Sequence, residues 1–195
     1  MAGSNSETVI HLASPGDIRL NVNCWKNGER ERSKTFVISS AVMCIASPVW
    51  RAMFSPSGRF MEAVQSAETK DVHFGEDDAD ALLLILRIAH LQFREIPEKI
   101  GFTELLDVGV ICDKYDMAEI VQPWLSRWKD RLKYSATEKG YEGWLFISWT
   151  FGLPKIYEQV AQNLVLHLTM SNDGQGPCRG GRELTRSMPP GAVGQ

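Results

Sequence analysis

The side chains that could do chemistry are spread widely along this chain. Its four histidines and four cysteines show no spacing typical of a metal site, a redox pair or a catalytic dyad. The sequence contains no Gly-x-Ser-x-Gly, His-Glu-x-x-His, Cys-x-x-Cys or phosphate-binding Gly-Lys-Ser/Thr motif. It therefore predicts a non-enzymatic protein with no catalytic residue, no metal site and no cofactor.

A cluster of acidic side chains could be mistaken for a cation site: Glu76, Asp77, Asp78 and Asp80. The cluster lacks the alternating oxygen ligands and the final Glu of a calcium loop. Carboxylates at the start of a helix accept hydrogen bonds from free N–H groups and oppose the helix dipole. We therefore expect the cluster to cap a helix over about 79–92. Ser39 and Ser40 have no activating neighbour in the sequence and are also expected to cap a helix.

The bulk composition is that of an ordinary globular protein. Of 195 residues, 44% are hydrophobic and 23% are charged, which allows one domain and a little more. The net charge of -3 and the lack of a basic stripe do not indicate nucleic-acid binding. No apolar run approaches the ~18 residues of a membrane span, and the first residues lack the pattern of a secretory signal. We expect a protein of the cytoplasm or nucleus with reduced cysteines.

The first part of the chain predicts a β-hairpin. Apolar residues alternate with polar ones from Ile18 to Asn23, as in a half-buried strand. Asn27-Gly28 favours a tight turn, and the charged run 29–34 is expected to be a solvated loop before the returning strand. The expected strands are 9–12, 18–23, 35–38 and 71–74.

Helices are expected to dominate the rest of the chain. Ser47-Pro48 opens one of them, because the hydroxyl can accept a first-turn N–H and proline has a preset φ. Pro123 is expected to interrupt another. Since strands come early and helices late, the chain predicts an α+β fold with a small sheet flanked by helices. The expected helices are 42–46, 48–54, 79–92, 103–115 with Thr103 as its cap, 118–122, 123–132, 144–151 and 156–168.

The segment from Phe36 to Phe54 resembles the signature of the BTB/POZ domain, in which a strand-end Phe precedes two short helices. The run 112–117 and the opening 17–20 also look like parts of this family, and the register is most similar to fungal members. The resemblance covers about 9–132 and implies the BTB/POZ fold there, without kelch or zinc-finger modules. Residues at matching places are Phe36, Val42, Met43, Ser47, Trp50, Met53 and Phe54.

Two further segments are expected beyond this range. The apolar helices within 137–170 carry too much aromatic surface to be stable alone, so this extension should dock on the main domain or on another chain. The tail 172–195 has six Gly and three Pro and no periodic apolar face, which predicts disorder.

The resemblance implies a protein-interaction module that forms a homodimer. Many family members pair through the first strand and the first helix. The alternative is that these residues only complete the monomer's own core. The corresponding residues here are Val9, Ile10, Leu12, Val42, Met43 and Ile45.

The resemblance also bears on the partner. Family members that recruit cullin-type ubiquitin ligases often carry a hydrophobic-x-Glu step, which Phe60-Met61-Glu62 matches, so the chain is expected to be a ligase substrate adaptor. Repressors of the family use a groove built from an Asp and a basic residue. Here Asp17 is present but Ser40 replaces the basic residue, which counts against corepressor binding. The alternative function is a dimerising scaffold for transcription-linked or structural assemblies.

Overall fold

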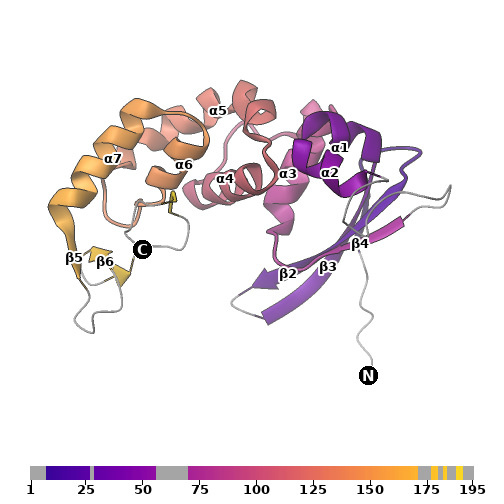
Figure 1. The fold of residues 1–195 in the computed structure, drawn as a ribbon, viewed down its shortest axis with the longest axis horizontal. Coiled ribbons are helices and arrows are strands. Elements are labelled where there is room, and N and C mark those ends of the chain that lie inside the picture. Colours follow the sequence, from indigo (N-terminus) through magenta and orange to yellow (C-terminus); the bar gives the residue numbers. More distant parts are fainter. Residues whose placement is uncertain are drawn as a thin grey trace. The chain divides into compact units, whose positions relative to one another are not determined.

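The computed structural model describes residues 8–26, 29–55, 70–170, 177–179, 182–183 and 188–190. The chain forms two compact units (Figure 1). The first unit comprises Met1–Pro97 and Ile111–Val121, and the second comprises Glu98–Val110 and Gln122–Gln195. Strands come first and helices dominate later, so the expected α+β class is confirmed.

The first unit holds most of the strands. Its elements are β1 (Thr8–His11), β2 (Ile18–Lys26), β3 (Glu29–Ile38), α1 (Ser40–Ala46), α2 (Pro48–Phe54), β4 (Lys70–Phe74), α3 (Ala79–Ala89) and the 3-10 helix η1 (Phe93–Glu95). Two helices contribute to both units: α4 (Phe102–Tyr115) and α5 (Ala118–Leu132). The second unit adds the 3-10 helix η2 (Lys133–Ser135), α6 (Trp144–Thr150), α7 (Pro154–His167), β5 (Leu168–Met170), β6 (Pro177–Arg179) and β7 (Arg182–Glu183).

The sheet of the first unit has four strands in the order β1-β3-β2-β4, of which β2, β3 and β4 are labelled in Figure 1. β2 and β3 are antiparallel, which confirms the predicted hairpin, while β1 and β4 are parallel to their neighbours. The charged run 29–34 is part of β3, so the prediction of a loop there was wrong. Most of this run pairs with β2, with a register shift between Asn23 and Trp25, because strand hydrogen bonds use the backbone and do not require apolar side chains.

The sheet has one apolar face and one polar face. The register aligns Leu20 with both Phe36 and Val72, and these side chains are buried on the face against which α3 packs. On the other face, Asn21 accepts a hydrogen bond from Thr35 at 2.7 Å and donates one to Asp71 at 3.1 Å. Period-two alternation explains this division, because it sends neighbouring residues to opposite faces.

In the helical hairpin α1–α2, α2 begins as predicted at Pro48, whereas α1 begins at Ser40 and not at 42, with Ser39 and not Ser40 as its cap. The Ser39 hydroxyl accepts the Val42 N–H, and the Ser47 hydroxyl accepts the Trp50 N–H at 3.1 Å, with Pro48 as the first helical residue. The fully buried Trp50 indole ring then packs against three other rings, whose centroids lie 5.1 to 5.4 Å away. These rings are Phe54, Phe74 and Tyr115.

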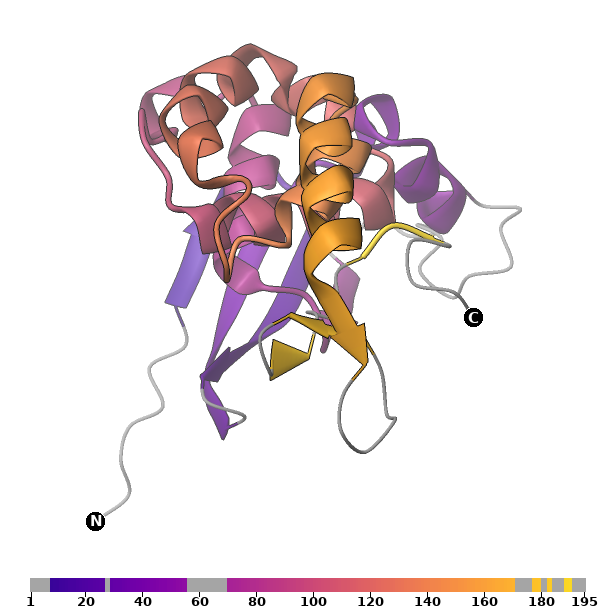
Figure 2. The same ribbon diagram turned by 90° about the vertical axis from the view of Figure 1, so that its left-hand side faces the viewer.

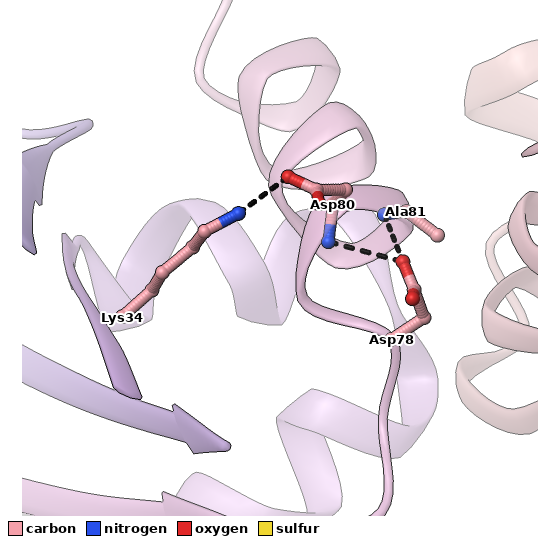
Figure 3. A network of polar contacts seen from close by, with 4 residues as sticks. All are labelled: Lys34, Asp78, Asp80 and Ala81. Carbon is pink, nitrogen blue, oxygen red and sulfur yellow. Dashed lines mark hydrogen bonds and ion pairs between the residues drawn. The ribbon is translucent and has the colours of Figure 1, made fainter. Parts of the chain in front are cut away.

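The acidic cluster does cap a helix, through Asp78 (Figure 3). Its carboxylate accepts the N–H groups of Asp80 and Ala81 at 3.0 and 2.8 Å. Asp80 in turn forms an ion pair with Lys34 of β3 at 2.5 Å. The helix ends at Ala89 and not at 92 as predicted, because the backbone turns into a left-handed conformation at Leu91.

Two details of the later helices differ from the predictions. Thr103 does not cap α4, which starts at Phe102 with the Gly101 N–H donating to the Glu104 carboxylate at 2.6 Å. Pro123 does not interrupt α5, which is continuous. Proline removes one hydrogen bond in the first turns, and burial of the apolar face offsets that loss. The buried residues of this face are Val121, Leu125 and Trp128.

The second unit is built around α6 and α7, which pack together and are visible in both views (Figures 1 and 2). The Phe102 ring of α4 lies 4.7 Å from the ring of Tyr141 and 6.2 Å from that of Trp144, measured between centroids. A Cβ on Gly143 would come within 2.9 Å of Leu106, so a larger residue there would require the Leu106 side chain to shift. Residues of α4 therefore share a core with α6, and this unit starts well before the predicted extension 137–170.

The predicted disordered tail overlaps a second, small sheet. β6 and β7 fall within 172–195 and pair with β5 in the order β5-β6-β7. These described parts of the tail are therefore paired backbone, although their sequence has no apolar periodicity. Over the residues that the structure covers, no helix combines the length and apolar character needed to cross a membrane.

Candidate protein-interaction surface

The start of α1 is held by Asp17. The backbone N–H of Ser40 donates to one Asp17 carboxylate oxygen at 2.7 Å, and the Ser40 hydroxyl donates to the other. A carboxylate at a helix N-terminus is further stabilised by the helix dipole. The structure thus brings together the two residues of the predicted groove position, and Ser40 supplies by hydrogen bonding what a basic residue would supply by charge.

His90, at the end of α3, holds the same end of α1 from another side. Its Nδ1 lies 2.8 Å from the Leu86 carbonyl oxygen, and its Nε2 lies 3.1 Å from the Ser39 backbone N. The ring must be neutral to do both, because Nδ1–H donates to the carbonyl while Nε2 accepts the Ser39 N–H. Burial lowers the pKa of His90, which favours this neutral form.

The other end of α1 is also fixed. The Arg51 Nε–H donates to the Cys44 carbonyl oxygen at 2.8 Å, and the Ser47 N–H donates to the Met43 carbonyl oxygen at 3.0 Å. Burial raises the pKa of the Cys44 thiol despite the opposing effect of Arg51, so this cysteine is not an activated nucleophile. α1 is therefore anchored at both ends.

The anchored helix presents an apolar side chain to solvent. Ile45 is 82% exposed, Val42 is half-buried, and Met43 is fully buried beneath them. On β1, Val9 is 41% exposed. Of the predicted dimer residues, Leu12 and Met43 complete the monomer's core, whereas Val9, Ile10, Val42 and Ile45 are reachable at the surface.

An open groove of about 640 Å³ lies between β1 and the chain that follows α3. No sequence pattern predicted this groove. Leu91 was predicted to lie within the helix over 79–92, whereas Leu91 and Phe93 both follow the end of α3 and are exposed, by 72% and 51%. Its lining includes Ile10, His11, Arg87, Leu91, Phe93 and Arg94.

Asp77 of the acidic cluster links the loop before α3 to α4 through hydrogen bonds. Its buried carboxylate accepts hydrogen bonds from the Tyr115 hydroxyl and the Lys114 ammonium group, each at 2.5 Å. Burial, and then the Asp77 carboxylate, raise the pKa of Tyr115. Within the described part of the chain, no group of three or more His, Cys, Asp or Glu side chains could hold a metal ion.

Comparison of the chain with protein-family models and with curated proteins finds no match. The predicted ligase contact Phe60, Met61 and Glu62 lies outside the described residues.

Proposed function

We propose that this chain is a BTB/POZ-type protein-interaction module that forms a homodimer and has no enzymatic activity. The observation that carries the proposal is the exposure of Ile45 on a helix anchored at both ends. A rigid apolar surface loses little conformational entropy on association, which is the condition for a stable interface. The order of elements, a hairpin followed by the α1–α2 pair, β4 and further helices, supports the family assignment.

The self-association is tested by an aspartate at the centre of the surface. Wild-type protein is expected to sediment as a dimer at concentrations on the order of tens of micromolar, and Ile45→Asp as a monomer, because a charge would be desolvated in the interface. The matched control is Leu166→Asp, since Leu166 is exposed to a similar degree (78%) on α7. A wild-type monomer at these concentrations would overturn the proposal.

The partner we propose is a cullin-type ubiquitin ligase, with the chain as substrate adaptor in the cytoplasm or nucleus. This part depends on the resemblance of Phe60-Met61-Glu62 to the hydrophobic-x-Glu step. The double variant Phe60→Ala, Glu62→Ala is expected to abolish cullin pulldown and to keep the unfolding midpoint of wild type. Absence of cullin in the wild-type pulldown would exclude the adaptor role.

A dimerising scaffold is the second candidate, favoured by exposed apolar residues at the end of α7. Val165 and Leu166 are 77% and 78% exposed. Deleting α6 and α7 would be a poor test of the scaffold function, because Trp144 of α6 is buried in a core that includes Phe102 of α4. The sharper test is Val165→Asp with Leu166→Asp: loss of proteins captured from native extract with the dimer retained would favour the scaffold over the adaptor.

A further inference from the structure

In the part of the chain that the structure describes, no strand pairs with the outer edge of β1. β1 pairs with β3 alone among the described strands. The Leu12 N–H donates to Val37 of β3 at 2.8 Å, and because backbone groups of successive residues point to opposite sides, those of Val9 and His11 point away from β3. Among the described residues, the Gln92 amide lies 3.5 Å from the His11 carbonyl oxygen and 3.3 Å from that of Leu12, at the end of β1. An unpaired edge is a template for strand addition.

The groove runs beside this edge. The register places Ile10 opposite Phe36, on the face of the sheet against which α3 packs. Ile10 also lines the groove, together with Leu91 and Phe93. A chain added to β1 would therefore direct every second side chain toward the apolar residues of the groove.

Leu91 has an unfavourable backbone conformation at the end of α3. Its φ is 61°, and the hydrogen bonds from Gln92 N–H to the Arg87 carbonyl and from Leu91 N–H to the Ile88 carbonyl form the turn that usually carries glycine. A leucine is disfavoured in this left-handed conformation. At the same position after α4 the chain has Asp116, a residue type that tolerates it better. Since Leu91 is mostly exposed, its side chain adds nothing comparable to the core.

The charge of the groove indicates the chemistry of the ligand. Among the described residues, Arg87 contacts Glu95, at 3.4 Å to its carbonyl oxygen and 3.6 Å to its carboxylate. Arg94 forms no ion pair with any residue that the structure describes. Two guanidinium groups against one carboxylate leave the groove positive, and arginine binds carboxylates through paired hydrogen bonds.

We propose that the groove binds an extended peptide of a partner protein, which adds to the outer edge of β1. The peptide places an apolar side chain against Leu91 and Phe93 and a carboxylate against Arg94. This inference goes beyond the homodimer. The groove shares Ile10 with the predicted dimer surface but excludes Ile45, so the inference rests on a homodimer that leaves the outer edge of β1 open.

The test uses the full chain and displayed random peptides of about eight residues, within the usual length of a strand. Selected peptides are expected to carry an apolar and an acidic residue at alternate positions. A fluorescent consensus peptide is then expected to bind about tenfold more weakly to Leu91→Gly and to Arg94→Glu. Leu166→Ala and Arg127→Glu, at exposed positions of the second unit, are the matched controls and should bind as wild type.

Leu91→Gly separates binding from folding. Glycine relieves the left-handed conformation, so the unfolding midpoint is expected to stay equal or to rise while binding falls. N-methylation of alternate peptide amides should also abolish binding, because strand addition needs those donors. The proposal is overturned if no peptide is selected, if selected peptides are basic, or if Leu91→Gly binds as wild type. If the Leu91→Gly variant is a monomer where wild type is a dimer, the groove binds a second copy of the chain, and the peptide proposal is also overturned.

Discussion

Tyr115→Phe tests the polar network that joins α4 to the loop before α3. The substitution removes one hydroxyl and leaves the ring, so the contacts with Trp50 at 5.1 Å and Phe74 at 6.1 Å are preserved. The lost hydrogen bond, 2.5 Å long, ends on the buried carboxylate of Asp77. Hydrogen bonds to charged groups contribute about 1.5–3 kcal/mol. Because Lys114 still compensates the charge, we expect a loss of about 2 kcal/mol in the free energy of unfolding.

The measurement is urea unfolding followed by tryptophan fluorescence, with the midpoint compared at constant slope. A loss of this size corresponds to a fall of about 4–8 °C in Tm for a chain of this length. The control is Tyr134→Phe, because Tyr134 is 80% exposed and should change stability by no more than about 0.5 kcal/mol.

A double-mutant cycle identifies the source of the loss. In an Asp77→Ala background, Tyr115→Phe should cost at least about 1 kcal/mol less than in wild type, since the acceptor is already absent. The reasoning is refuted if Tyr115→Phe costs less than about 0.5 kcal/mol, or if its cost is the same in both backgrounds.

Two further predictions concern the first unit. Burial lowers the pKa of His90 below that of the unfolded chain, so its contribution to stability is complete above about pH 6.5 and is lost as the pH falls through the lowered folded-state pKa. Thermal unfolding measured from about pH 7.5 to about pH 5, a range that brackets the unfolded-state pKa of about 6.5, should therefore show a steeper decline in Tm for wild type than for His90→Gln. Equal slopes of Tm against pH would contradict this role of His90. Gly16→Ala should destabilise by about 1–3 kcal/mol in urea unfolding, because its Cβ would come within 2.5 Å of Val37 and 3.0 Å of the Ile38 carbonyl oxygen; an unchanged midpoint would mean that this loop moves freely.

Local features of the fold were predictable where one short segment contains all the groups involved. Ser47-Pro48 and Asp78 cap helices with their own side chains, and the alternation from Ile18 onward identifies β2. These are hydrogen bonds over two or three residues, or a period of two, and both can be read along the chain. The α+β class followed from the order of such segments.

Features that depend on distant partners were not predictable in this way. The charged run became part of β3 because β2 lies beside it, and α5 stays helical through Pro123 because its apolar face is buried. The second unit begins at Glu98 because Phe102 packs with Trp144, which lies far along the sequence. Each outcome is a balance between local preference and long-range packing.

The candidate surfaces show the same division. The sequence indicated which apolar residues were available near the first strand and helix, but burial separated Met43 and Leu12, which belong to the core, from Ile45 and Val9, which do not. Asp17 and Ser40 meet because β2 and β3 pair, and the groove exists because the end of α3 passes beside β1. Hydrophobicity is a property of single residues, whereas exposure is a property of the packed chain, so only the folded structure could assign these residues to a surface.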